Sequence, residues 1–229
     1  MTPMMEQYFE IKNQYKDHIV FYRLGDFYEM FFDDAILASR ELELTLTGRD
    51  CGEEERAPMC GVPFHSAEGY IGTLVSRGYK VAICEQVEDP AKAKGIVKRD
   101  VIRIITPGTV IEGSMLDESR NNYLAVVYAT ADHKEYGLCF CDCSTGEIHL
   151  TQMSGDDLFM RVSNELGRFS PSEILVNRYA ANNMALKEFA DRRLNVHIEV
   201  RDDSEFDAAA AQDSILRQFR SVSLSALNV

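Results

Sequence analysis

The stretch Leu24-Gly25-Asp26-Phe27-Tyr28-Glu29-Met30-Phe31-Phe32-Asp33-Asp34-Ala35 decides the local fold of the N-terminal region. It begins where an apolar run breaks at Gly25, a residue that adopts backbone angles other residues resist and so permits a sharp turn. Side chains two residues apart in an extended strand point to the same side. We therefore expect Phe27 and Glu29 to project together, with Tyr28 facing the other way.

This arrangement of Phe27 and Glu29 has two interpretations. An apolar ring beside a hydrogen-bonding acid suits the reading of a partly unstacked base step, in which a wedge enters the stack and a polar group tests the base beside it. The alternative is an ordinary junction between a strand and a helix, with Phe27 packed in the core. The local pattern alone leaves both open.

The chain contains a series of spaced motifs: Thr2-Pro3-Met4-Met5-Glu6-Gln7-Tyr8, Phe21-Tyr22-Arg23-Leu24-Gly25-Asp26-Phe27-Tyr28-Glu29, Ala57-Pro58-Met59-Cys60-Gly61-Val62-Pro63-Phe64-His65, Val81-Ala82-Ile83-Cys84-Glu85-Gln86, Asp89-Pro90 and Val101-Ile102-Arg103-Ile104-Ile105-Thr106-Pro107-Gly108-Thr109. In this order they resemble the bacterial MutS family of DNA mismatch repair proteins. The resemblance is dense to about Thr109 and continues, more thinly, through Asp142-Cys143-Ser144-Thr145-Gly146.

The resemblance implies a role in DNA recognition for both members of the pair. Phe27 would enter the duplex from the minor-groove side beside a mispaired or unpaired base, where unstacking is less costly than at a well-paired step. The protein would then recognise how easily the DNA is deformed and not its base sequence. Glu29 would bond the base next to the wedge; an ionised carboxylate only accepts hydrogen bonds, and its charge penalises DNA that offers no donor.

Other residues are weaker candidates for contacts with the DNA backbone. They are His65, Arg49, Arg56 and Arg103. Of the remaining residues in the opening stretch, we expect Tyr28 to be a packing residue and Met30 and Phe31 to belong to the core.

The net charge of −13 is unfavourable for DNA binding, because phosphate contacts supply most non-specific affinity. One local exception is the basic stretch formed by Lys92, Lys94, Lys98, Arg99 and Arg103, which is either a solvated loop and strand end or a patch that faces phosphates. We therefore expect the chain by itself to bind even mismatched DNA weakly. The resemblance places the family's dimer contacts largely in the ATPase domain, which implies that this chain alone is a monomer.

The composition is typical of a globular protein, with 45% hydrophobic and 27% charged residues in a chain of 229. No apolar run approaches the roughly 18 residues that span a bilayer, and the first residues lack the features of a signal peptide. The six cysteines lack zinc-finger spacing, which favours reduced thiols in a cytoplasmic protein that has no membrane association.

The first domain, the mismatch-recognition domain of the family, is expected over residues 1–108, with a linker over 109–121. Helices interspersed with strands predict an α/β fold with a mixed sheet. The expected elements are a helix from Pro3 to Gln14 or Tyr15, a strand from Ile19 to Leu24, a helix from Phe32 to Leu42, a short strand from Glu43 to Thr47, a surface loop from Arg49 to Arg56, a helix from Ala67 to Arg77, and strands from Tyr79 to Val87 and from Val97 to Ile105.

The second domain is expected over residues 122–229. Three antiparallel strands followed by alternating helices and strands predict a ribonuclease H-like α/β fold, which the resemblance also implies for the MutS connector domain, here truncated at its C-terminal end. The expected elements are strands Tyr123 to Thr130, Tyr136 to Cys143 and Glu147 to Gln152, a helix Asp156 to Arg168, a strand Glu173 to Asn177, a helix Asn183 to Arg192, a strand Asn195 to Val200 and a helical stretch after Asp207.

The sequence contains no phosphate-binding G-x-x-x-x-G-K-[ST] loop. We therefore expect no cofactor and no ATPase activity in this chain. The resemblance implies ATP and Mg²⁺ for the full-length family, which forms homodimers, and docking of the MutL partner through the connector domain.

Two other functions compete with mismatch recognition. A ribonuclease H-like sheet can carry a metal-dependent nuclease site, and Asp142 before Ser144-Thr145-Gly146 resembles part of one, but two-metal chemistry needs several convergent carboxylates and only Glu147 lies nearby. We expect Asp142 to face away from Cys139, Cys141 and Cys143. The third possibility is a protein-interaction module only, an interpretation that we favour for residues 122–229.

Overall fold

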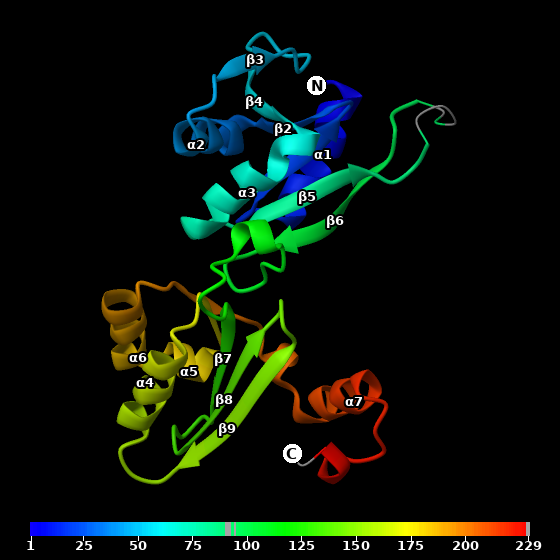
Figure 1. Cartoon of the computed structure of the whole chain (residues 1–229). Coiled ribbons are helices and arrows are strands. Elements are labelled where there is room, and N and C mark those ends of the chain that lie inside the picture. Colours follow the sequence, from blue (N-terminus) through cyan, green and yellow to red (C-terminus); the bar gives the residue numbers. More distant parts are fainter. Residues whose placement is uncertain (90–92, 94, 228–229) are drawn as a thin grey trace. The chain divides into compact units, whose positions relative to one another are not determined.

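The computed structural model describes residues 1–89, 93 and 95–227. The chain divides into two compact units, Met1–Arg120 and Asn121–Val229, each described by itself. Each unit has a sheet flanked by helices (Figure 1). The predicted α/β class with mixed sheets is confirmed for both units, since each sheet contains parallel and antiparallel pairs.

The described residues of the first unit form a six-stranded sheet in the order β3-β4-β2-β1-β5-β6, in which only β1 and β5 run parallel. Its strands are β1 (Ile19–Leu24), β2 (Phe27–Phe31), β3 (Thr47–Arg49), β4 (Ala57–Pro63), β5 (Val81–Gln86) and β6 (Arg99–Ile105). Its helices are α1 (Pro3–Gln14), α2 (Phe32–Leu42) and α3 (Ala67–Ser76), with short 3₁₀ turns η1 (Phe64–Ser66) and η2 (Gly113–Met115).

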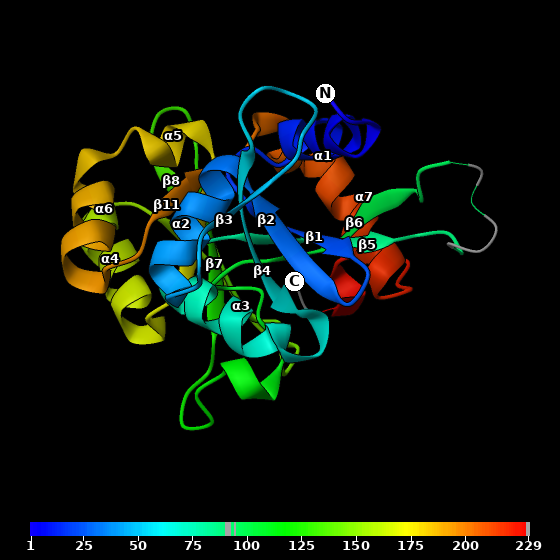
Figure 2. The same cartoon turned by 90° about the horizontal axis from the view of Figure 1, so that it is seen from above.

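Both faces of this sheet are covered. Figure 2 shows α1 and α3 on opposite sides of the strands. Phe21 and Met30 are buried on the side of α3, whereas Tyr22 and Phe31 are buried on the side of α1. The centre of β1 is therefore apolar on both faces, as in other sheets sandwiched between helices.

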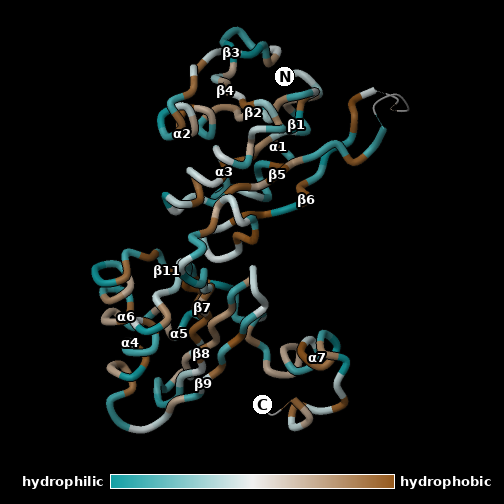
Figure 3. Tube along the Cα trace, in the orientation of Figure 1, coloured by the Kyte–Doolittle hydropathy of each residue, from teal (hydrophilic) through white to brown (hydrophobic). Residues whose placement is uncertain are grey.

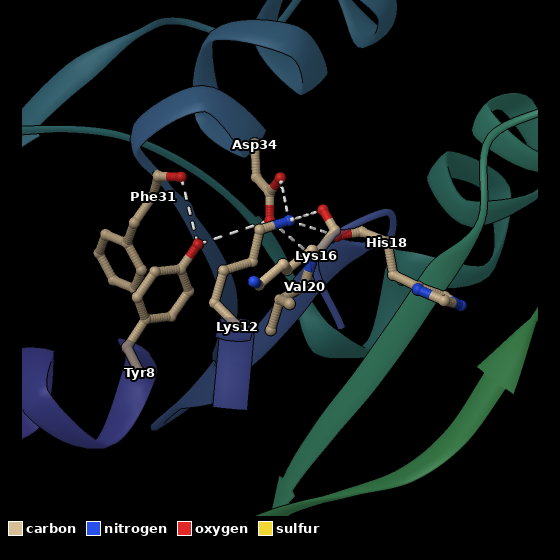
Figure 4. Close-up of polar contacts among 7 residues, drawn as sticks. All are labelled: Tyr8, Lys12, Lys16, His18, Val20, Phe31 and Asp34. Carbon is tan, nitrogen blue, oxygen red and sulfur yellow. Dashed lines mark hydrogen bonds and ion pairs between the residues drawn. The ribbon is translucent and has the colours of Figure 1, made fainter. Parts of the chain in front are cut away.

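A buried ion pair ties α1 to the junction between β2 and α2 (Figure 4). Lys12 Nζ lies 2.8 Å from Asp34 Oδ1 and also donates to the backbone oxygens of Lys16 and His18 at 3.1 and 2.6 Å. Asp34 Oδ2 accepts the backbone N–H of Val20 at 3.0 Å. Burial raises the pKa of Asp34, and the Lys12 and Val20 hydrogen bonds oppose that rise.

Strand β4 lies between β2 and β3 and approaches β2 closely at Gly61. A Cβ added to Gly61 would lie 3.2 Å from the carbonyl oxygen of Tyr28 and 3.4 Å from Cγ of Glu29, its cross-strand partner. Any larger residue at this position would push against the backbone and side chain of β2.

The second unit has the strand order β11-β10-β7-β8-β9 among its described residues. Strands β7 to β9 are antiparallel, and β10 and β11 continue the sheet in parallel, which is the order predicted for a ribonuclease H-like fold. The strands are β7 (Tyr123–Ala129), β8 (Glu135–Asp142), β9 (Glu147–Ser154), β10 (Glu173–Val176) and β11 (Ile198–Val200). The helices are α4 (Leu158–Phe169), α5 (Arg178–Ala181), α6 (Met184–Phe189) and α7 (Ala208–Gln218).

The structure corrects some of the predicted elements and confirms one predicted loop. The short strand expected from Glu43 to Thr47 is wrong, because Glu43 ends α2 in the left-handed conformation (φ 55°) and the strand begins only at Thr47. Strands β2 and β4 and the short helix α5 were not predicted. The predicted surface loop between β3 and β4 is present and hydrophilic (Figure 3).

The segment after β6 belongs to the first unit and packs into its core. Val110 is 4% exposed in its core, and Met115 and Leu116 lie against the same cluster. In the part of the chain that the structure describes, no helix is both long and apolar enough to cross a membrane.

We predict that Lys12→Met lowers the free energy of unfolding by about 3–5 kcal/mol at pH 7, because it leaves Asp34 buried without its cation. The loss of Lys12 raises the pKa of Asp34 further above its ordinary value of 3.8. A raised pKa in the folded state means that stability falls as pH rises above that ordinary value. The deficit should therefore be largest at pH 7 and shrink toward pH 4.5.

Urea unfolding at both pH values measures this difference. Lys16→Met is the matched control, because Lys16 is exposed and its side chain loses the same charge. An equal, pH-independent deficit in both variants would contradict the assignment of the effect to Asp34.

We predict that Gly61→Ala lowers the free energy of unfolding by about 1–3 kcal/mol, because the new methyl group meets the backbone of β2. Gly69→Ala is the opposite control: it lies in α3 with no atom within 4 Å of an added Cβ, so it should raise stability by about 0.5–1 kcal/mol. Urea unfolding of both variants measures these changes. If Gly61→Ala left the free energy of unfolding unchanged, strand β4 would have to move away from β2 without cost, which would contradict the prediction.

Candidate functional site

The turn between β1 and β2 presents Phe27 to solvent. Gly25 adopts a positive φ of 57° there, and Leu24 pairs with Phe27 directly after the turn. The Phe27 side chain is 45% exposed, although it lies in a strand bonded on both sides, to β1 and to β4. Exposure of a large apolar ring on a rigid element argues against the interpretation of Phe27 as a core residue.

Glu29 lies on the same face of β2 and forms an ion pair with Arg49 of β3. The Glu29 side chain is 15% exposed and that of Arg49 is 36% exposed. Two of the predicted site residues are thus in direct contact, and Phe27 lies two positions along the same strand. The expectation that Phe27 and Glu29 share a face, opposite Tyr28, matches the alternation along β2.

On the opposite face of β2, the ring of Tyr28 packs in the core and its hydroxyl forms a hydrogen bond. Its ring is 8% exposed in the core, and its hydroxyl donates to Glu85 of β5. Burial, followed by the bond to Glu85, raises the pKa of Tyr28 to about 12, so the hydroxyl stays protonated. Met30 and Phe31 are fully buried, as predicted.

A second aromatic residue lies beside the turn. Phe64 follows β4, its backbone N–H donates to Asp26 O at 2.9 Å, and its ring is 41% exposed. The Arg23 guanidinium carbon lies 3.6 Å from the centre of that ring, and Arg23 Nη1 is 3.2 Å from Glu85 Oε1. These contacts fasten the turn that carries Phe27 from the opposite face of the sheet.

His65 is exposed in η1, with its ring edge-on to Phe64 at 5.8 Å. It therefore lies at the end of β4 where Pro63 pairs with Phe27. Arg56 is exposed in the loop between β3 and β4.

Two arginines of the basic stretch, Arg99 and Arg103, are engaged away from this site. Arg103 pairs with Glu112, and its strand register places it on the face opposite Phe27 and Glu29. Arg99 is 9% exposed and donates to Arg23 O at 2.7 Å and to the Gln7 side chain at 3.1 Å, so it supports the fold instead of forming a surface cation. Lys92 and Lys94 lie outside the described residues.

In the second unit, the Asp142 carboxylate accepts hydrogen bonds from the turn between β8 and β9. Its Oδ1 accepts the N–H and hydroxyl of Ser144 at 2.8 and 2.6 Å, and its Oδ2 accepts Asn122 N–H at 3.1 Å. Burial opposes its ionisation, but these hydrogen bonds lower its pKa overall. Such a carboxylate stabilises a turn and has little capacity left for a metal.

The neighbours of Asp142 do not complete a nuclease site. Glu147 pairs with Asp142 across the strands but bonds Asn121, Tyr123 and His149. Within the described ranges, no group of three or more His, Cys, Asp or Glu side chains could hold a metal ion. Cys139 and Cys141 lie on the opposite face of β8, and the described cysteines are all free thiols.

Three contributors to the site were missed in the sequence: Gly61, Phe64 and Glu85. The first two belong to one spaced motif with His65, but the motif itself does not indicate that this segment meets the turn. Nothing local to Glu85 indicates its contact with Tyr28, because the two residues are 57 positions apart and lie on strands separated by β1.

Comparison with known proteins identifies the family to which both units belong. The model of MutS domain I matches residues 2–114, and that of MutS domain II matches residues 122–229. The DNA mismatch repair protein MutS of Acetivibrio thermocellus is 54% identical over 220 residues, 96% of this chain and 25% of the relative. The protein of the same name from Ruminiclostridium cellulolyticum is 52% identical over 225 residues, 98% of this chain and 26% of the relative.

The chain thus spans about a quarter of the length of the curated relatives that it matches. The two matched models follow one another along the chain and correspond to the two α/β units described above. These matches, and the identity over nearly the whole length of the chain, show that it belongs to the MutS family. It contains domains I and II of that family, and the second of these is ribonuclease H-like.

Proposed function

We propose that this chain is the mismatch-reading region of a MutS protein acting in DNA mismatch repair. Phe27 is the wedge that enters an opened base step, and Glu29 tests the base beside it. The observation that carries the proposal is the exposed Phe27 ring, two residues from a carboxylate on the same face of a strand that is bonded on both sides.

The spacing of the two side chains fits this task. Residues two apart in an antiparallel strand are about 6.8 Å apart. Successive bases along one DNA strand are about 3.4 Å apart, so a ring inserted between two bases opens that step to about twice this distance. Glu29 can then lie level with a base next to the ring while Phe27 fills the gap.

Selectivity follows from the energy of unstacking. Opening a well-paired step costs a few kcal/mol, and the cost is least where a base is mismatched. A rigid wedge that makes no demand on the identity of the flanking bases therefore selects deformable sites. Glu29 adds a polar test, since its carboxylate accepts a base N–H, whereas a base acceptor such as purine N7 requires that the carboxyl first be protonated.

The charge of the chain limits what it can do alone. With a net charge of −13 and with both Arg99 and Arg103 engaged within the fold, the chain is poorly suited to bind phosphates by itself. We propose that the rest of a full-length protein supplies the DNA clamp, the homodimer contacts and the ATPase with its ATP and Mg²⁺. The isolated chain is then a weakly binding monomer.

For the second unit we propose an interaction role, in which the connector domain docks MutL. The involvement of Asp142 and Glu147 in hydrogen bonds of turns and strands favours this role over that of a metal-dependent nuclease. The free cysteines are compatible with a cytoplasmic protein.

We predict that Phe27→Ala in the full-length protein lowers the preference for a G·T duplex over matched duplex at least tenfold, because a methyl group cannot fill an opened step. Fluorescence anisotropy with the two duplexes measures the ratio of affinities. Phe219→Ala, which removes a 55% exposed ring from the second unit, is the matched control and should leave the ratio unchanged. Retention of the full preference by Phe27→Ala would make Phe27 a structural residue only.

We predict that Glu29→Gln reduces discrimination mainly by strengthening the binding of matched DNA several-fold, since it removes a negative charge near phosphates but keeps a polar side chain. Titration of matched duplex at low salt measures this. Unchanged affinity for matched DNA would contradict a repulsive role for the carboxylate.

A further inference from the structure

The ion pair between Glu29 and Arg49 joins the base-testing carboxylate to a cation on another strand. On the basis of the function proposed above, we propose that Arg49 is a specificity-determining residue that exchanges partners. It remains on Glu29 in the free protein and on matched DNA, and it moves to a backbone phosphate when Glu29 turns to a base beside an opened step.

The geometry requires both side chains to reach across β4. Arg49 pairs with Ala57 and Glu29 pairs with Gly61, four positions further along that strand. Four residues of a strand span roughly 13 Å, so the two side chains must extend toward each other over β4. Gly61 presents no side chain at this crossing, and an added Cβ there would lie 3.4 Å from Glu29 Cγ.

Arg49 has donors left for a second partner. The pair uses Nη1 of the guanidinium, and no hydrogen bond from Nε or Nη2 occurs among the described residues. The side chain is 36% exposed and lies on the edge strand β3, where a phosphate can approach it. The planar guanidinium suits bidentate contact with phosphate, which a lysine would make only as a point charge.

The exchange links reading of the base to binding of the backbone. Where the base offers a donor, Glu29 gains a new partner and Arg49 is released to add one phosphate contact. On matched DNA, Glu29 finds no donor and keeps Arg49, so that contact is not made. The pair thereby withholds one cation from matched DNA.

Two simpler accounts predict different behaviour. If Arg49 contacts phosphate on every duplex, its removal weakens matched and mismatched binding equally. If Glu29 only repels phosphates, its replacement strengthens matched binding whether or not Arg49 is present. The exchange alone requires that the gain from replacing Glu29 depend on Arg49.

The experiment is a double-mutant cycle in the full-length protein with Glu29→Gln, Arg49→Gln and the double variant. Anisotropy with matched and G·T duplex is measured over a series of salt concentrations, because each phosphate contact changes the slope of log K against log salt by about 0.9. We expect Glu29→Gln to tighten matched binding several-fold and to steepen its slope by about 0.9. In the double variant the change of slope should vanish, and the gain in affinity should shrink to the part that removal of the Glu29 charge gives by itself.

Two control variants separate this result from general effects. Arg56→Gln removes a neighbouring exposed cation and should affect both duplexes equally, with or without Glu29. Arg49→Lys in the Glu29→Gln background keeps a cation and should retain the steeper slope. Loss of the slope change in Arg49→Lys as well would assign the effect to packing and overturn the proposal.

The failures of the two proposals are distinguishable. A G·T preference that does not depend on Phe27 would remove the proposed function itself. A preference that depends on Phe27, together with a Glu29→Gln gain and slope change that are undiminished in the double variant, would leave that function in place and refute the partner exchange.

Discussion

The first unit depends on the carboxylate of Asp34, which is 6% exposed and holds three segments of chain together. It binds Lys12 of α1 and the backbone of Val20 in β1, and it stands at the start of α2, directly after β2. Removing one member of a buried ion pair is costly because the other remains as an unpaired charge. Helix and strands are therefore fixed to one another around the hairpin that carries Phe27.

The hairpin exposes an apolar side chain that would ordinarily be buried. Tyr28 and Met30 are buried in the core on one side of β2, and Phe31 is buried in the core on the other side. Phe27 is left exposed and Glu29 is paired with a partly exposed arginine. The Phe27 ring therefore adds little to stability, because much of its apolar surface remains in water.

The hairpin could be predicted from the sequence because alternation along a strand is a local property. Long-range pairing could not: Arg49 was a candidate, but its contact with Glu29 arises only because β4 brings β3 alongside β2. Strand β4 itself was missed, since Pro58, Gly61 and Pro63 are residue types depleted in strands. Arg103 was a candidate by charge, yet the register of β6 places it on the other face, where it pairs with Glu112.

The bonding of β2 on both sides has a consequence for the timing of recognition. Because hydrogen-bond ladders run along both of its edges, the backbone at Phe27 cannot advance or retreat without breaking them. Under the wedge role proposed for Phe27, the moving partner is then the duplex, which opens a step before the ring enters. In that proposal, the rate of insertion depends on how long a base step of the DNA stays open. The pairing of the bases sets this time, and no motion of the protein backbone at Phe27 contributes to it.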